Sequence, residues 1–271
     1  MQIDKGRAMI TGASSGIGSI YADRLARRGY DLILVARDAA RLTALAERLT
    51  EETGREIEVM CADLTCRDDL SGVEARLRSD KRISLLLNNA GSGSLRSLLS
   101  SDPDQLEAMI QLNVTALTRL THAVAPGLVE RGDGVIINLA SSVAIYPMLL
   151  NGTYCGTKAF VLSFTQALHQ ELNGKGVQVQ AVLPGATDTP FWSGAEFDIS
   201  LFPKHFVMSC DELVDAALSG LDQHELVTIP SLPNPAEWEK IEALRLQIAA
   251  KISRNHPADR YKTPAAHAEL V

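Results

Sequence analysis

The chain has 271 residues, the size of one large α/β domain, and its 46% hydrophobic content is ample for a sizeable core. A formal net charge of −7 disfavours a nucleic-acid partner, and no apolar run is long enough to predict a membrane span. The four cysteines form no CxxC pair and the six histidines are scattered, so no metal site is expected, and an N-terminus without an apolar signal core predicts a cytoplasmic protein.

The first predicted strand, residues 5–10, runs into a glycine-rich turn that opens a helix. The turn reads TGASSGIG over residues 11–18. In this layout the amides at a helix N-terminus hold phosphate, and glycines let the backbone approach a pyrophosphate. The spacing is GxxxGxG, so the generic GxGxxG fingerprint of dinucleotide-binding proteins is not met. The turn alone therefore favours a dinucleotide site without identifying its class.

The same turn also matches the nucleophile elbow of a serine hydrolase. Residues 12–16 read GASSG, which fits GxSxG with Ser14 as the nucleophile. A late histidine would complete the triad: His224, His256 or His267. Against this alternative, the elbow would follow the first strand, so no earlier strand–helix loop precedes it to donate an oxyanion-hole amide. It also leaves Gly18 and Arg37 without a role.

The second predicted strand, residues 31–35, ends beside basic side chains. Arg37 stands at its tip, Asp38 follows, and Arg41 lies one turn into the next helix. In dinucleotide-binding folds an acid near this point takes the ribose 2′-hydroxyl of NAD, whereas an arginine accommodates the 2′-phosphate of NADP. The pattern favours NADP, although both arginines also suit the solvated start of an ordinary helix.

The rest of the chain alternates apolar strands with amphipathic helices. Strands are predicted at 56–61, 83–87, 135–139, 177–183 and 226–229, and helices at 39–53, 67–78, 103–129, 154–172, 211–222 and 235–253. The run ISLLL at 83–87 is apolar throughout, which fits a parallel sheet covered on both faces. The predicted fold is therefore α/β: a Rossmann-like, doubly wound, seven-stranded, mostly parallel sheet with helices on both faces, in a single domain over 1–271.

Three residues after the predicted fifth strand can form one acid–base device. Tyr154 and Lys158 are four apart, so on a helix they share a face. Ser141 follows the strand at 135–139, at the carboxyl edge where open α/β sheets bind ligands. A nearby ammonium lowers the pKa of a phenol from about 10. The set suits proton transfer at an oxygen whose carbon gains or loses hydride, although Tyr-x-x-x-Lys alone is common on surface helices.

Over roughly residues 5–230 the chain resembles the short-chain dehydrogenase/reductase family. The matching features, in family order and spacing, are TGASSGIG at 11–18, NNAG at 88–91, Asn113, Ser141, Tyr154 with Lys158, and Pro184-Gly185. The family's own GxxxGxG turn accounts for the departure from the generic glycine spacing. The resemblance implies an NADP-dependent oxidoreductase that forms a homodimer or homotetramer through the helices at 103–129 and 154–172.

The resemblance also implies a role for each matching position. Tyr154 would be the general acid/base, Lys158 would bind the nicotinamide ribose and lower the tyrosine pKa, Ser141 would steady the substrate oxygen, and Asn113 would hold a water that links Lys158 to solvent. The pyrophosphate turn would comprise Gly12, Ser14, Ser15, Gly16, Ile17 and Gly18. The remaining cofactor contacts would be Arg37 and Arg41 for the 2′-phosphate, Asp63 and Leu64 for adenine, Asn89, Ala90 and Gly91 for the adenosine ribose, and Pro184, Gly185, Thr187 and Thr189 for the nicotinamide, with Thr189 on its carboxamide.

The substrate side is predicted from the long connection at 184–210, which is rich in large apolar side chains. Such a loop is typical of a lid, and with residues 147–150 it would wall an apolar pocket beside Tyr154. A small apolar carbonyl or alcohol substrate is expected, although the same side chains can equally pack onto the body or a partner subunit.

The extra helix at 235–253 carries an apolar stripe that must be buried in this subunit or another. Its members are Trp238, Ile241, Leu244, Ile248 and Ile252. A non-catalytic NADP-binding regulator on the same fold is a further alternative. A pure binder, however, does not require the complete set of Asn113, Ser141, Tyr154 and Lys158.

Overall fold

The computed structural model describes residues 5–147, 151–194 and 198–261. The chain divides into two compact units, the first ending at Ser231 and the second beginning at Leu232. A single domain over 1–271 stays a prediction.

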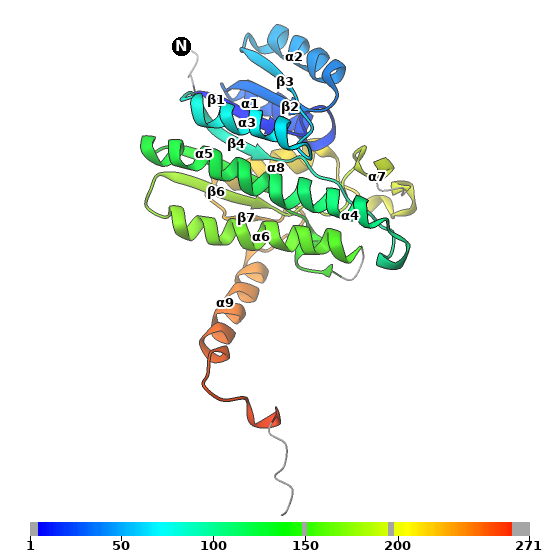
Figure 1. Cartoon of the computed structure of the whole chain (residues 1–271), viewed down its shortest axis with the longest axis vertical. Coiled ribbons are helices and arrows are strands. Elements are labelled where there is room, and N and C mark those ends of the chain that lie inside the picture. The colour runs from blue at the N-terminus through cyan, green and yellow to red at the C-terminus, as the bar shows by residue number, and fades with distance from the viewer. Residues whose placement is uncertain (1–4, 148–150, 195–197, 262–271) are drawn as a thin grey trace, which may run out of the picture. The chain divides into compact units, whose positions relative to one another are not determined.

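A parallel sheet forms the centre of the first unit (Figure 1). Its seven strands, in chain order, are β1 (Arg7–Thr11), β2 (Asp31–Ala36), β3 (Ile57–Cys61), β4 (Ile83–Asn88), β5 (Gly134–Leu139), β6 (Val177–Val182) and β7 (Val227–Thr228). They lie in the order β3-β2-β1-β4-β5-β6-β7, and all neighbouring strands are parallel. The predicted fold class is confirmed. The strand order reverses between β1 and β4, which is where open α/β sheets bind ligands.

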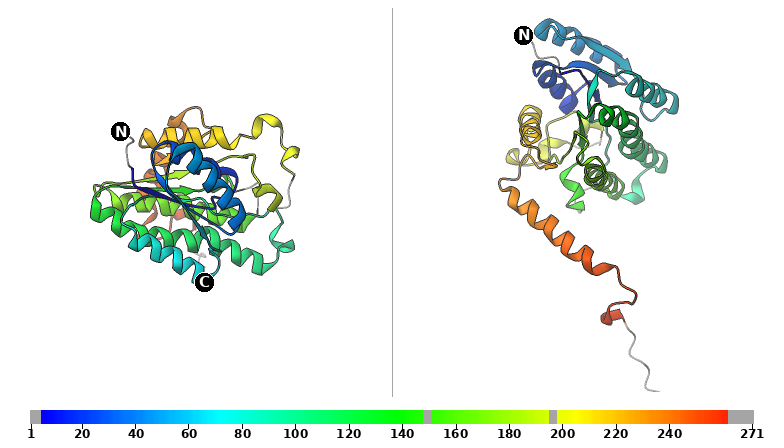
Figure 2. Two further views of the ribbon diagram at one scale, coloured as in Figure 1. Left: turned by 90° about the horizontal axis from the view of Figure 1, so that it is seen from above. Right: turned by 90° about the vertical axis from the view of Figure 1, so that its left-hand side faces the viewer.

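Helices cover both faces of this sheet, as Figures 1 and 2 show. The helices α1 (Gly16–Arg27), α2 (Ala39–Thr53) and α8 (Cys210–Asp222) pack on one face, and α3 (Arg67–Ser79), α5 (Leu117–Arg131) and α6 (Gly152–Leu172) pack on the other. Successive strand residues point to opposite faces, so Ile10 and Met9 belong to different cores. This double burial explains why the central strands read as continuous apolar runs.

A π-helical turn interrupts the helix predicted at 103–129. The structure has α4 at Pro103–Ile110, a π turn at Gln111–Ala116, and then α5. Asn113 lies in this turn and is only 2% exposed. Hydrophobic periodicity predicts helix through such a turn, because one inserted residue shifts the apolar pattern without ending it.

Buried amides tie β4 to β5 just below the carboxyl edge of the sheet. Asn88 Nδ2 donates to Asn138 Oδ1 at 2.9 Å and to Thr121 Oγ1 at 3.0 Å, while Asn138 Nδ2 donates to Thr165 Oγ1 at 3.0 Å. The two threonines belong to α5 and α6. The network therefore fixes the strand ends that carry Asn89 and Ser141 relative to the helices.

The second unit contains α9 (Pro235–Ile252) and a short 3₁₀ turn at Asp259–Tyr261. Asn234 caps α9 by accepting the N–H of Ala236 at 3.1 Å, and Pro235 occupies the first helical position. Within the described ranges, no helix of either unit combines the length and the apolarity needed to cross a bilayer.

Candidate active site

The glycine turn joins β1 to α1 in a backbone conformation that favours glycine. Gly12 and Gly16 have φ of +66° and +55°. A Cβ on Gly12 would lie 2.8 Å from Asn89 Nδ2, and one on Gly18 would lie 2.3 Å from the carbonyl oxygen of Gly12. Ser15, the N-cap of α1, makes no side-chain hydrogen bond to the helix. The first N–H groups of α1 are therefore open to an anionic group such as a pyrophosphate.

Thr11, which sequence reasoning missed, holds this turn against the end of β4. Its Oγ1 donates to the carbonyl of Leu87 at 3.2 Å and accepts the N–H groups of Asn89 and Ala90, each at 3.0 Å. Asn89 Nδ2 in turn donates to the carbonyls of Thr11 at 2.9 Å and Gly12 at 3.1 Å. The only signal for Thr11 in the sequence is its place between the strand and the first glycine.

At the tip of β2, the guanidinium groups of Arg37 and Arg41 face solvent. Their side chains are 80% and 63% exposed. Asp38 instead caps α2, because its carboxylate accepts the N–H of Arg41 at 3.0 Å and lies 3.3 Å from the Nε of the same residue. The carboxylate is engaged by its own helix while Arg37 is presented outward, so the local charges suit a phosphate better than a ribose hydroxyl.

Asp63 and Leu64 follow β3, next to the tip of β2. Hydrogen bonds from the hydroxyl and the N–H of Thr65 hold the pKa of Asp63 below its ordinary value, and Arg37, 3.9 Å away, adds to this effect. Leu64 is buried in the core. Its side chain is therefore part of the packing under this edge.

Tyr154 stands in the first turn of α6, where a cap fixes its position. Asn151 Oδ1 accepts the N–H groups of Thr153 at 2.8 Å and Tyr154 at 3.3 Å, and its Nδ2 donates to the carbonyl of Arg96 at 2.7 Å. Sequence reasoning did not assign Asn151 this role, although an asparagine three residues before an apolar helical run is a cap signal.

Burial dominates the electrostatics of the Tyr154 and Lys158 pair. Loss of water raises the pKa of Tyr154 to about 12, and a hydrogen bond with the Ser141 side chain acts in the opposite direction. Loss of water also lowers the pKa of Lys158 to about 8. The net shift of the tyrosine pKa is therefore upward, and a lowering effect of Lys158 on this pKa stays a prediction. The ammonium donates to the carbonyl of Leu139 at 2.8 Å and lies 5.9 Å from the centre of the tyrosine ring.

Asn113 and Gly91 complete this cluster. Asn113 Oδ1 accepts the N–H of Ser92 at 2.9 Å, and its Nδ2 donates to the carbonyl of Ser92 at 2.9 Å and to Thr157 Oγ1 at 3.0 Å. A Cβ on Gly91 would lie 3.2 Å from Asn113 Oδ1 and 3.5 Å from Lys158 Nζ. The NNAG segment, the π turn and α6 therefore meet at one place. Both amide hydrogens of Asn113 are used, so a further partner must donate to Oδ1.

The segment after β6 runs back to the glycine turn. The carbonyl of Pro184 accepts the N–H of Ser142 at 2.8 Å. Thr189 lies against the turn, since a Cβ on Gly16 would be 3.3 Å from its Cγ2. Thr187 is buried and serves the segment itself: its Oγ1 donates to the carbonyl of Gly185 at 3.2 Å, and it pairs with Met208 in an isolated β-bridge.

Aromatic side chains from the predicted lid reach the phenol. Phe191, in the short helix α7 (Phe191–Gly194), has its ring centre 5.7 Å from that of Tyr154, and Trp192 Nε1 donates to the carbonyl of Thr187 at 2.7 Å. Around the phenol lies a small apolar cluster of Leu106, Met109, Val143, Cys155 and Phe191. The predicted wall residues Met148, Leu149, Leu150 and Phe197 lie outside the described residues.

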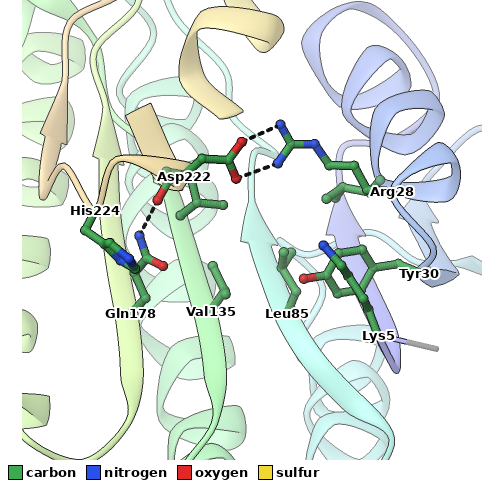
Figure 3. Close-up of a pocket in the computed structure, with 10 residues that line it drawn as sticks. Lys5, Arg28, Tyr30, Leu85, Val135, Gln178, Asp222 and His224 are labelled. Atoms are coloured by element: carbon green, nitrogen blue, oxygen red, sulfur yellow. Dashed lines mark hydrogen bonds and ion pairs between the residues drawn. The ribbon is translucent and has the colours of Figure 1, made fainter. Parts of the chain in front are cut away.

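His224 lies far from Ser14. Ser14 follows the carboxyl end of β1, whereas His224 lines a cavity of about 250 Å³ at the amino end of the sheet, with Lys5, Tyr30 and Gln178 (Figure 3). His256 belongs to the second unit and contacts Asn255. His267 lies outside the described residues. The hydrolase alternative is not favoured.

Comparisons with known proteins point to one family. The sequence profile of the short chain dehydrogenase family matches residues 7–198. A short-chain dehydrogenase from Sphingobium yanoikuyae, solved in complex with NADPH, is 49% identical with a TM-score of 0.92, covering 95% of this chain and 100% of that one. The bulky-bulky ketone specific alcohol dehydrogenase from Comamonas testosteroni is 44% identical with a TM-score of 0.88, covering 96% and 99%. The 17-beta-hydroxysteroid dehydrogenase type 3 of Homo sapiens is 34% identical over 67% of this chain, and the match spans only 59% of that protein.

The buried lysine makes a prediction for stability against pH. The pKa of Lys158 is about 8 in the folded chain against an ordinary 10.5, so the unfolded chain binds more protons between these values. The cost of burying this group is full below pH 8 and falls as pH rises. We therefore expect Lys158→Met to stabilise the protein near neutral pH, and this advantage to shrink by up to about 3 kcal/mol towards pH ~10.

Urea unfolding of both proteins at each pH measures the difference. Lys81→Met is the control, because Lys81 is an exposed partner of Glu130 and its removal changes stability little across this range. An advantage of Lys158→Met that does not change with pH would show that the lysine keeps its ordinary pKa.

Proposed function

The chain belongs to the short-chain dehydrogenase/reductase family, and from this premise we propose that it is an NADP-dependent oxidoreductase that reduces a hydrophobic ketone or aldehyde, or oxidises the matching alcohol. The observation that carries the proposal is the convergence of Tyr154, Ser141 and Lys158 beside Gly91 at the carboxyl edge of the sheet. The relatives that bind NADPH or act on ketones support it. A cytoplasmic, homo-oligomeric enzyme stays a prediction.

The residues present fit the cofactor. Its pyrophosphate would lie along Gly12 and Gly18, where the backbone leaves no room for a Cβ, beside the open N-terminus of α1. Arg37 would bind the 2′-phosphate, since its guanidinium faces solvent at the tip of β2. Lys158 would bind the nicotinamide ribose and Thr189 the carboxamide. When bound, the cofactor supplies or accepts the hydride.

Proton transfer falls to Tyr154. In reduction, its hydroxyl donates a hydrogen bond to the substrate oxygen and gives up its proton as negative charge develops there. Ser141, whose side chain lowers the pKa of this phenol, holds the same oxygen. Lys158, with a pKa of about 8, is mostly charged near neutral pH and stabilises the phenolate that remains. In oxidation the phenolate takes the alcohol proton back.

A raised tyrosine pKa agrees with this role. A phenol with a pKa of about 12 is fully protonated at neutral pH, so the proton needed for reduction is always present. The cost appears when the phenolate forms, and there the buried ammonium contributes most, because charges attract more strongly where water is excluded. Asn113, whose Oδ1 lies beside Gly91 close to Lys158, would hold the water that returns protons from solvent.

The apolar cluster around Tyr154 supports a hydrophobic substrate. Phe191 and Met109 pack beside the phenol, and Ser141 is a polar group close to it. Such a pocket binds through apolar area and uses its few polar groups to orient one oxygen. An apolar ketone meets both conditions.

The mechanism is tested by Tyr154→Phe. Without the hydroxyl no proton reaches the substrate oxygen, so we expect kcat to fall by about 10²–10⁴-fold while NADPH binding is kept. Turnover is followed by NADPH absorbance on a panel of dialkyl, alkyl-aryl and diaryl ketones, and binding by NADPH fluorescence. Tyr30→Phe, at the amino end of the sheet, is the matched control and should turn over normally. Retained turnover in Tyr154→Phe contradicts the mechanism.

Cofactor choice is tested separately by Arg37→Ala. Losing a charge-assisted contact to the 2′-phosphate should raise the Kd for NADPH by about 10- to 100-fold. The Kd for NADH, which has no such phosphate, should not change. Arg48→Ala, on the same helix as Arg41 but paired with Glu52, is the control. Equal effects on both cofactors would mean that Arg37 does not read the phosphate.

Substrate size is tested by Phe191→Ala. Gly93 and Tyr154 both lie against this ring: a Cβ on Gly93 would come within 2.3 Å of Phe191 Cζ and 3.2 Å of Tyr154 Cε2. Removing the ring enlarges the pocket beside the phenol, so kcat/KM should shift towards diaryl over alkyl-aryl ketones by about tenfold or more. Phe206→Ala, on an exposed side chain of the same connection, should leave the ratio unchanged. An unchanged ratio in Phe191→Ala would remove Phe191 from the substrate pocket.

A further inference from the structure

The helix α9 is well formed locally, and within the second unit its apolar side chains have no surface to pack against. A side-chain cap and a proline begin it, and Glu242 pairs with Arg245 at 2.7 Å along its surface. None of its residues is buried in the described structure. Ile241, Leu244, Ile248 and Ile252 are between 42% and 71% exposed.

These side chains form one stripe. At about 100° per residue, they and Trp238 lie within an arc of roughly 120° on the helix. Leu246, the other large exposed apolar residue of α9, points to the opposite side. Isolated helices of this length are marginal in water, and most helical stability in proteins comes from packing an apolar face. The stripe therefore requires a partner surface outside the second unit.

The charges of α9 indicate what that partner is. Residues 235–244 carry Glu237, Glu239 and Glu242 against one lysine, whereas residues 245–254 carry Arg245, Lys251 and Arg254 and no acid. The helix is thus acidic in its first half and basic after it. Glu239 and Arg254 point away from the stripe, whereas the other acids and basic residues named lie in it or along its edges. A second copy laid antiparallel would place each acidic half beside a basic half, and a parallel copy would place like charges together.

We propose that the stripe binds the α9 stripe of a second copy of this chain, with the two helices antiparallel about a twofold axis. A twofold contact uses the same patch on both chains, and the charge pattern of α9 is its own complement in that arrangement. Because the two helices run antiparallel, Trp238 of each chain would lie towards the Ile252 end of the other. This surface is separate from the helices at 103–129 and 154–172, through which the family resemblance implies assembly.

The stripe is tested by comparing Ile248→Glu with Leu246→Glu in the full chain. Both add one carboxylate to the same helix at exposed positions, but only Ile248 lies in the stripe. Sedimentation over a dilution series should show that Ile248→Glu weakens self-association by roughly a hundredfold, because it buries an unpaired charge, while Leu246→Glu does not. A chain that is monomeric throughout, or an oligomer equally stable in both variants, overturns the proposal.

The antiparallel arrangement is tested by charge exchange. One variant carries Glu237→Lys and Glu242→Lys, and the other carries Arg245→Glu and Lys251→Glu. Each alone should associate weakly, because like charges then face each other. An equal mixture should form the heterodimer, seen as one mixed species by native mass spectrometry. Recovery in the mixture also shows that each variant is folded. A mixture no more associated than its components overturns the antiparallel pairing.

Discussion

The exclusion of water from a phenol and an ammonium that share one turn of α6 is the constraint behind the site. Burial raises the pKa of Tyr154 and so keeps the phenol protonated at neutral pH. Burial lowers the pKa of Lys158, but only to about 8, so most of the lysine still carries its proton at neutral pH. The same burial strengthens the attraction between them once the phenol loses its proton. A hydrogen bond from the lysine ammonium to the carbonyl of Leu139 partly offsets the cost of burying the charge. Because Leu139 ends β5, this bond also fixes the lysine relative to the sheet.

The rest of the first unit positions that pair. Parallel strands end at one edge, so the NNAG segment after β4 and Ser141 after β5 arrive beside α6 without any long excursion of the chain. The π turn brings the amide of Asn113 to the same place, where it bonds to Ser92 and to Thr157 of α6. Buried amides of Asn88 and Asn138 hold the two strand ends in register below. Hydrogen bonds between these elements therefore fix the positions of the side chains at the site.

The sequence predicts the fold and the identity of the cluster because periodicity and motif spacing are local properties. Apolar runs that alternate with amphipathic helices predict the sheet. Tyr154 and Lys158 are four residues apart, so they share a face of any helix that contains them. It does not predict the bonds of Thr11 or those of the Asn151 Nδ2 group, because their partners lie 50 or more residues away. It also does not predict the net upward shift of the Tyr154 pKa. The lysine four residues away is visible in the sequence, whereas the loss of water around the two side chains is not. Nor does helical periodicity reveal a π turn at Asn113.

The hydrogen bonds of Thr11 and Asn89 hold the glycine turn in place and so affect how tightly it can bind a ligand. They brace the glycine turn from the neighbouring strand, so its amides are already aimed before any ligand arrives and little chain entropy is lost on binding. The connection after β6 is secured differently, by the Thr187–Met208 bridge at its base and by the Trp192 indole. The glycine turn is thus held by a neighbouring strand, and the connection after β6 is held by bonds within itself. Such a division would let a single invariant nucleotide be held tightly while a range of carbon skeletons is accommodated opposite it.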